Sequence, residues 1–299
     1  MATFTYEFTE RWLKRPDGHE IYTKQWIPYD TKPIAIVVFF HGLAEHINRY
    51  EHVFSVFAKN GIKVGGFDQR GFGRTCCRSG KKGVTGGLET TMMDMQALID
   101  SMCVKDIPVY VMGHSMGGGL AIRFCHDYPD GIAGVIGCSP MIEGTYKPSS
   151  AGHEPDFLHR TFKGIISRKV LQSTVIMLPV LDHSILTRDE YRIQLYKEDP
   201  YIHPYASFKL LDDIFANGEY LLHTVSQTFT SSILIGHGTD DQLTSYSASK
   251  KFIDMIPSAN KRLDTYVDAR HELHNELEMD DVVYSYINWI RDQIRNTKK

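Results

Sequence analysis

Short apolar runs alternate with amphipathic stretches through the first half of the chain. Apolar and polar residues alternate around Phe4, Tyr6 and Phe8, and a second strand pattern covers residues 19–27, so we expect two strands there. The Asp17-Gly18 pair between them indicates the turn of an antiparallel hairpin. Four mostly apolar runs follow, typical of central strands in a parallel sheet covered on both faces: 34–40, 62–67, 109–113 and 133–139.

Stretches with apolar residues at helical spacing lie between these runs. The spacing predicts helices over residues 49–60, 88–104 and 116–128, and Gly61 provides a C-terminal stop for the first. The same spacing predicts a last helix near the C-terminus, with Val283, Tyr286, Ile287, Ile290 and Ile294 on its apolar face.

The pattern changes after Pro140. Residues 141–230 show no clear strand alternation and are expected to be mostly helical, whereas strand patterns return at 231–236 and 261–267. This order predicts an α/β fold, with an eight-stranded, mostly parallel sheet flanked by helices and a helical cap inserted after the sixth strand. We expect a core of residues 1–140 and 231–299, and a cap with its return to the core at 141–230.

Composition narrows the class of protein. The 299 residues include 33 Lys and Arg against 36 Asp and Glu, so no basic excess points to a nucleic-acid partner. Five cysteines, an odd number without a repeating framework, indicate free thiols in a reducing compartment. We find no apolar run of membrane-spanning length and no signal-peptide pattern, so we expect a cytoplasmic protein. The sequence does not indicate an oligomeric state.

The strongest chemical signal is the sequence GHSMG at residues 113–117, which has the form G-x-S-x-G. It follows a predicted strand and precedes a predicted helix, the context in which a sharp turn exposes a nucleophilic serine. Ser115 is therefore the candidate nucleophile. The alternative is a glycine-rich turn with an inert serine.

A serine nucleophile needs a histidine base and an acid that orients it. Asp240 and Asp241 follow the strand predicted at 231–236, and His271 and His274 follow the strand predicted at 261–267. The ends of parallel strands meet at one edge of a sheet, where ligands bind. Spacing leaves open which acid and which histidine act.

The loop after the third strand is expected to complete the site. Its backbone N–H at Leu43, together with that of Met116, would form an oxyanion hole.

Five segments in order carry a resemblance to a known family. The chain resembles the monoacylglycerol lipase family of the α/β-hydrolase superfamily at residues 41–50 (HGLAEHINRY), 68–73 (DQRGFG), 113–118 (GHSMGG), 238–241 (GTDD) and 270–274 (RHELH). The resemblance implies that Asp241 is the catalytic acid and His271 the base, with His274 as a neighbour. It also implies that Glu45, Arg49 and His114 hold the glycerol end of the substrate.

The chain departs from the family pattern at two places. Thr75 stands where the family usually has serine, and no clear acidic residue occupies the glycerol-contact position of the cap. Arg192 lies near that position, as in fungal members. Alternative interpretations remain for the tentative substrate contacts. Glu45 and Arg49 could form an ordinary ion pair in the loop, and His114 could be a packing residue.

We expect neither a metal nor another cofactor. The sequence HELH at 271–274 is one residue short of the zincin motif H-E-x-x-H, and neither His41 nor His46 completes a metal-ligand pattern. In the cap, the apolar residues between 157 and 171 and the run 175–181 fit either core packing or an acyl tunnel with a rim that enters a lipid surface.

These expectations describe a serine hydrolase that cleaves monoacylglycerols to fatty acid and glycerol through an acyl-enzyme. Its expected partner surface is a lipid droplet or intracellular membrane, reached through the cap. The alternatives are a broader carboxylesterase or lysophospholipase, a transacylase, and, least favoured, a catalytically silent lipid-binding module.

Overall fold

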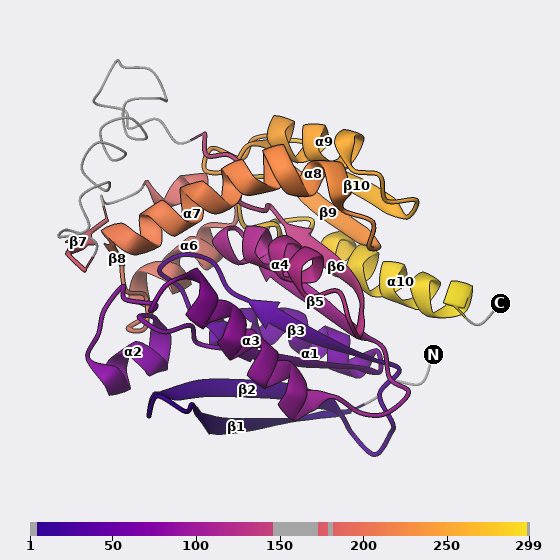
Figure 1. Cartoon of the computed structure of the whole chain (residues 1–299), viewed down its shortest axis with the longest axis horizontal. Helices are drawn as coiled ribbons and strands as arrows, with labels where there is room; N and C mark the ends of the chain where they lie inside the picture. Colours follow the sequence, from indigo (N-terminus) through magenta and orange to yellow (C-terminus); the bar gives the residue numbers. More distant parts are fainter. Residues whose placement is uncertain (1–4, 146–172, 179–181, 298–299) are drawn as a thin grey trace.

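An eight-stranded sheet forms the centre of the protein (Figure 1), as seen in a computed structural model that describes residues 5–145, 173–178 and 182–297. The strand order is β1-β2-β4-β3-β5-β6-β9-β10. The strands are β1 (Tyr6–Lys14), β2 (Glu20–Pro28), β3 (Ala35–Phe40), β4 (Ile62–Phe67), β5 (Val109–His114), β6 (Ile132–Cys138), β9 (Ile233–Gly238) and β10 (Lys261–Tyr266). The hairpin β1–β2 and the pair β2–β4 are antiparallel, and the other pairs are parallel. All eight predicted strands are confirmed.

Helices cover both faces of this sheet (Figure 1). Buried side chains form two clusters. One joins the sheet to α3 (Leu88–Met102), α4 (Met116–Asp127), α7 (Phe208–Tyr220) and α9 (Tyr246–Met255). The other joins it to α1 (Glu51–Lys59) and α10 (Met279–Thr297). Every residue of β3 and β5 is buried, because these central strands have a layer of helices on each side.

The predicted helices are present, with one change at a boundary. Residues 47–50 form a 3₁₀ turn, η1 (Ile47–Tyr50), so the helix expected from residue 49 begins at Glu51. Shorter elements complete the core: α2 (Gly73–Ser79), the π-helical turn η4 (Leu221–Val225), α8 (Ser226–Thr228) and the 3₁₀ turn η5 (Leu273–Asn275).

The segment between β6 and β9 contains two strands that the sequence did not predict. β7 (Val175–Met177) and β8 (Tyr205–Ser207) pair antiparallel, and the 3₁₀ turn η3 (His183–Ile185) and helix α6 (Glu190–Glu198) lie between them. The prediction of a mostly helical cap did not include these two strands, since strands of three residues are too short to show a period of two. The predicted apolar stretch 157–171 and residues 179–181 lie outside the described residues, and the domain boundaries stay a prediction.

The β7–β8 ribbon is attached to the core beside the loop after β3. The Ser207 N–H donates to the Gly83 carbonyl at 2.9 Å, and the His203 N–H donates to the Ala44 carbonyl at 3.0 Å. A Cβ on Gly83 would lie 2.7 Å from the backbone of Tyr205, and its φ of +65° also favours glycine. This part of the cap therefore lies against the edge where the strands end.

Two further expectations concern cysteines and membranes. All five cysteines are free thiols, as expected. Within the described ranges, no helix combines the length and the apolar composition that a bilayer crossing requires.

Candidate active site

Ser115 occupies a sharp turn between β5 and α4. Its φ is 54° and its ψ is −121°, a conformation that is costly for a residue with a side chain. The turn is held by close backbone packing: a Cβ on Gly113 would lie 2.0 Å from the Gly117 carbonyl oxygen, and one on Gly117 would lie 2.3 Å from that of Phe40. The two glycines of the motif are therefore required by the space around them, and Ser115 is presented at the start of α4.

The structure brings Asp241 and His271 together from the ends of β9 and β10. His271 Nδ1 lies 2.8 Å from Asp241 Oδ2. The other carboxylate oxygen, Oδ1, accepts the backbone N–H groups of Leu243 at 2.8 Å and Thr244 at 2.9 Å. The neighbouring Asp240 is half exposed and faces Arg270 instead, so the geometry favours Asp241 as the partner of His271, and the catalytic roles of both stay a prediction.

Electrostatics favour a charged pair at this contact. Burial opposes the charge on Asp241, but the adjacent His271 and His237 hold the pKa of its carboxyl well below the usual range. Burial likewise opposes protonation of His271, but Asp241 raises the pKa of His271 above its ordinary value. An imidazole in this position is a stronger base than in water and is stabilised once it takes a proton.

The two residues expected to supply the oxyanion hole lie at the same cavity as Ser115. Leu43 and Met116 both line the cavity that contains Ser115 and His271. Met116 is the first residue of α4, so its N–H has no partner within the helix. Within the described part of the chain, no hydrogen bond uses the N–H of Leu43 or of Met116. Both groups are available to an oxygen atom in the cavity.

A buried ion network supports the loop after β3. Glu45 accepts the Gly42 N–H at 2.5 Å and the Tyr50 hydroxyl at 2.6 Å, and it pairs with Arg49 at 2.5 Å. Arg49 also donates to both oxygens of Glu272, each at 2.8 Å. Burial opposes the charge of Glu272, but Arg49 lowers its pKa to about 2. Glu45 and Arg49 therefore form the ion pair that was one of the two interpretations. Both side chains also line the cavity, and their contact with substrate stays a prediction.

The ring of His114 lies next to those of His271 and His274. Its ring centroid is 4.7 Å from that of His271 and 4.7 Å from that of His274. Burial lowers the pKa of His114 to about 3, so its ring is neutral. His114 lines the cavity, and its Nδ1 is buried without a hydrogen-bond partner among the described residues. Its substrate role stays a prediction.

Two groups of buried side chains lie close enough to share a cation. The ligand atoms of His114, Cys138 and His274 lie within 4.8 Å of one another, as do those of Glu45, Glu272 and His274. Sequence motifs do not reveal these groups, because their members come from separate strands and loops. His41 and His46 take other partners, the Gln69 N–H at 2.9 Å and Asp199 at 2.8 Å. The expectation of no metal stays a prediction.

The cavity next to Ser115 has a volume of about 410 Å³. Most of its wall is apolar and comes from the cap, α7 and the loop after β6, with Met141, Met177, Leu178, Ile202, Pro204, Leu211, Ile214 and Phe215 among the lining residues. Glu45 lies beside Ser115 across Gly42, Arg49 pairs with Glu45, and all three line the cavity. The cavity therefore suits an amphiphilic molecule whose polar end is held next to the serine.

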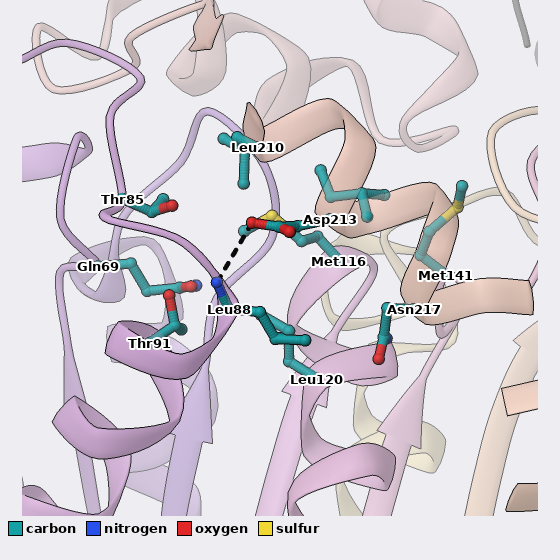
Figure 2. A pocket seen from close by; sticks show the side chains of 11 residues that line it. Gln69, Thr85, Leu88, Thr91, Met116, Leu120, Met141, Leu210, Asp213 and Asn217 are labelled. Carbon is teal, nitrogen blue, oxygen red and sulfur yellow. Dashed lines mark hydrogen bonds between the residues drawn. The ribbon is translucent and has the colours of Figure 1, made fainter. Parts of the chain in front are cut away.

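A second, smaller cavity is lined by residues of α3, α4 and α7, among them Leu88, Met116 and Asp213 (Figure 2). It has a volume of about 20 Å³, which is sufficient for one water molecule. Met116, Met141 and Ile214 line both cavities and form the wall between them. Figure 2 shows Asp213 of α7 pointing across it to the Leu88 N–H, a hydrogen bond of 3.2 Å that ties α7 to α3.

Sequence reasoning missed three residues that complete this geometry. Thr244 donates its hydroxyl to Asp241 Oδ2 at 2.7 Å, and His237 Nε2 lies 3.2 Å from the same oxygen. Glu272 pairs with Arg49. His237 directly follows the strand predicted at 231–236, and Glu272 lies in the segment 270–274, so their positions could be predicted but their partners could not.

Comparisons with known proteins agree with this geometry. The family described as "Serine aminopeptidase, S33" matches residues 31–278. An abhydrolase domain-containing protein of Dictyostelium discoideum is 34% identical over 96% of this chain, which spans only 29% of that longer protein. The monoglyceride lipase of Homo sapiens is 30% identical, covering 93% of this chain and 89% of its own length.

Solved structures give the same relationship. A soluble variant of monoglyceride lipase from Saccharomyces cerevisiae, in complex with a substrate analog, superposes with a TM-score of 0.81 at 25% identity, over 97% of this chain and 96% of its own. The monoacylglycerol lipase of Paleococcus ferrophilus superposes with a TM-score of 0.79 at 26% identity, over 92% and 99%. The chain therefore belongs to the serine aminopeptidase S33 family of α/β-hydrolases and is related to monoglyceride lipases.

Proposed function

We propose that this protein hydrolyses the ester bond of monoacylglycerols to a free fatty acid and glycerol. Ser115 Oγ attacks the ester carbonyl while His271 takes its proton, and His271 then donates that proton to the leaving glycerol oxygen. Asp241 orients His271 and stabilises its charged form. The N–H groups of Leu43 and Met116 bind the oxyanion, and water activated by His271 releases the fatty acid from Ser115.

The observation that carries this proposal is the arrangement of the cavity around Ser115. A mostly apolar cavity of about 410 Å³ accepts an acyl chain, and Glu45 and His114 lie with Ser115 around Gly42, where a Cβ would be 2.6, 3.3 and 3.3 Å from them. A substrate with one chain and a small polar end fits this division. The names of the human and yeast relatives support the same substrate.

The test is fatty acid release by the purified protein from long-chain mono-, di- and triacylglycerol and from lysophospholipid. We expect release chiefly from monoacylglycerol, and loss on the order of a million-fold in Ser115→Ala. Release mainly from another substrate would keep the serine mechanism and overturn the substrate assignment, in favour of a broader carboxylesterase or lysophospholipase. Acyl transfer to an added alcohol in place of hydrolysis would indicate a transacylase.

A fluorophosphonate probe separates catalysis from silent lipid binding. We expect covalent labelling of the wild-type protein and none of Ser115→Ala, since only an activated serine reacts. A wild-type protein that binds lipid without labelling would be a non-catalytic module.

We also propose that the enzyme is cytoplasmic and associates peripherally with lipid droplets or intracellular membranes through its cap. Four large apolar side chains in the described part of the cap are exposed: Val175 at 37%, Met177 at 64%, Tyr191 at 68% and Leu195 at 43%. Met177 also lines the cavity, so the exposed apolar surface is continuous with the substrate space. Apolar side chains of this kind bind the boundary of a lipid layer.

Liposome flotation of the whole protein tests this association. We expect the variant Met177→Ser/Tyr191→Ser to float less than wild type. Tyr29→Ser is the matched control, because Tyr29 is 56% exposed but follows β2 next to the start of β4, at the opposite edge of the sheet. Equal flotation of the cap variant and the wild type, or no flotation of either, would contradict docking through the cap.

A further inference from the structure

A second histidine lies against the candidate catalytic acid. Three side chains surround Asp241 Oδ2: His271 Nδ1 at 2.8 Å, Thr244 Oγ1 at 2.7 Å and His237 Nε2 at 3.2 Å. His237 is in β9, four residues before Asp241, and is 0% exposed. The mechanism above uses His271 and leaves His237 without a role.

The neighbours of His237 determine which ring nitrogen carries a proton. Nε2 lies near two acceptors, Asp241 Oδ2 and the Thr244 carbonyl oxygen at 3.3 Å. A bare nitrogen facing two acceptors would be repelled, so Nε2 carries the hydrogen: it forms a hydrogen bond with the Thr244 carbonyl, and Asp241 Oδ2 lies 3.2 Å from the same nitrogen. Nδ1 lies 2.8 Å from Ser249 Oγ, whose hydroxyl can donate to it. Ser249 of α9 therefore holds the ring in the form whose Nε2–H lies next to Asp241 and the Thr244 carbonyl.

We propose that His237 is a positioning residue for the catalytic acid, an inference that rests on the proposed role of Asp241 in ester hydrolysis. It acts in two ways. It keeps Oδ2 directed at His271, while the Leu243 and Thr244 N–H groups hold Oδ1. It also shares the negative charge of Oδ2, so that Asp241 attracts the proton of His271 less strongly than an aspartate with fewer donors would.

The effect of His237 on the charge of Asp241 changes the protonation of His271 in one direction. Removal of the His237 donor leaves more negative charge facing His271, which stabilises the imidazolium and makes His271 harder to deprotonate. Other titratable groups near His237 do not change this direction: the Tyr246 ring lies 6.0 Å away, and the closest charged partner is Asp241 itself. In a plot of activity against pH, the acid limb, which is the fall in activity on the acid side, should therefore move to higher pH when the donor is lost.

The experiment compares His237→Leu, which removes the donor, with His237→Gln, whose side-chain amide can donate from a similar position. We expect kcat to fall on the order of tenfold in the leucine variant with KM nearly unchanged, as for the loss of one hydrogen bond to a charged group. We expect its acid limb to move to higher pH, and the glutamine variant to recover most of both effects. Ser249→Ala, which leaves His237 in place, should move the limb in the same direction by less.

A second readout needs no substrate. The proton between His271 Nδ1 and Asp241 gives a far-downfield NMR resonance when the bond is short and charged, and we expect the leucine variant to shift it. An unchanged resonance and acid limb in a folded His237→Leu protein would overturn the proposal, as would a glutamine variant no better than leucine. If His237→Leu does not fold, Ser249→Ala decides by the same readouts.

The design separates this proposal from the proposed function. If the wild-type protein does not cleave monoacylglycerol, the substrate assignment fails, but hydrolysis of a simple p-nitrophenyl ester and the downfield resonance still report on Asp241 and His271. Normal monoacylglycerol hydrolysis with no response to His237→Leu would leave the function standing and remove the positioning role.

Discussion

Arg49 donates to both carboxylate oxygens of Glu272, each at 2.8 Å, across 223 positions of sequence. Both side chains are buried, with exposed fractions of 7% and 5%. The pair joins the segment after β3, which carries the Leu43 N–H, to the loop after β10, which carries His271. Through Glu45 and the Gly42 N–H, the network continues to the backbone of the proposed oxyanion hole.

We expect Glu272→Gln to destabilise the fold at neutral pH. Arg49 lowers the pKa of Glu272 from 4.5 to about 2, so the carboxylate contributes stability that is present above pH 4.5 and lost as the pH falls toward about 2. The variant should lose about 1.5–3 kcal/mol of unfolding free energy at pH 7, the range for a hydrogen bond to a charged group. Denaturant unfolding at several pH values measures this, and the difference from wild type should shrink in acid.

The matched control for Glu272→Gln is Asp254→Asn. Asp254 forms an ion pair with Lys250 at 2.8 Å, but their side chains are 63% and 56% exposed. Exposed pairs of this kind contribute little, so the control should unfold at the wild-type denaturant concentration. A Glu272→Gln protein as stable as this control would show that the buried network has no net effect on stability.

Arg49→Lys tests the geometry of the network separately from its charge. Lysine keeps the positive charge but lacks the planar fork that contacts Glu45 and both oxygens of Glu272. We expect kcat to fall on the order of tenfold, because the Gly42 loop is then held less firmly. Kinetics with a simple ester measure the change, and wild-type kcat in a folded variant would contradict it.

The pH dependence of activity follows from the environment of His271. Asp241 raises the pKa of His271 above 6.5, and only neutral His271 can accept the serine proton. The value of kcat/KM should therefore fall as the pH drops through a midpoint above 6.5. A pH profile in a simple ester assay measures this midpoint, and a value at or below 6.5 would contradict the paired geometry.

Asp241→Asn provides the control for this profile. Loss of the carboxylate removes the charge that raises the pKa of His271, so the remaining activity should have its acid midpoint at lower pH. The rate itself should fall on the order of 10⁴-fold. An unchanged rate would assign the acid to another residue.

Gly117→Ala should prevent formation of the turn that presents Ser115. A Cβ there would lie 2.3 Å from the Phe40 carbonyl oxygen and 2.5 Å from that of His41, and neither backbone atom can move away without displacing β3. We expect an inactive protein with lowered thermal stability. In Gly80→Ala, by contrast, the Cβ meets no atom within 4 Å and only the positive φ of 71° is unfavourable.

The Gly80→Ala protein should therefore keep its activity and lose roughly 1–2 kcal/mol of stability, the cost of a left-handed residue. Melting curves and ester hydrolysis on both variants make the comparison. Full activity in Gly117→Ala would mean that the turn tolerates a side chain and is looser than its packing indicates.

The parts of the fold that could be predicted from sequence are those set by local periodicity. Eight strands and the main helices follow from apolar spacing of 2 and about 3.6 residues, which each segment carries by itself. The sharp turn at Ser115 could be predicted for the same reason, because its glycines, its serine, the preceding strand and the following helix all lie within a few residues of one another. The three-residue strands β7 and β8 fall below the length at which such a period can be seen.

The sequence by itself determined the sheet, the sharp turn at Ser115 and a choice between two acids and two histidines. The family resemblance narrowed that choice to Asp241 and His271. Only the tertiary structure decided which side chains touch: it placed β9 beside β10, so that His237, Asp241 and His271 meet, and it brought Glu272 to Arg49. The physical reason is that hydrogen bonds and ion pairs depend on distances of about 3 Å between loops, and these distances are set by how the sheet is assembled rather than by any one segment.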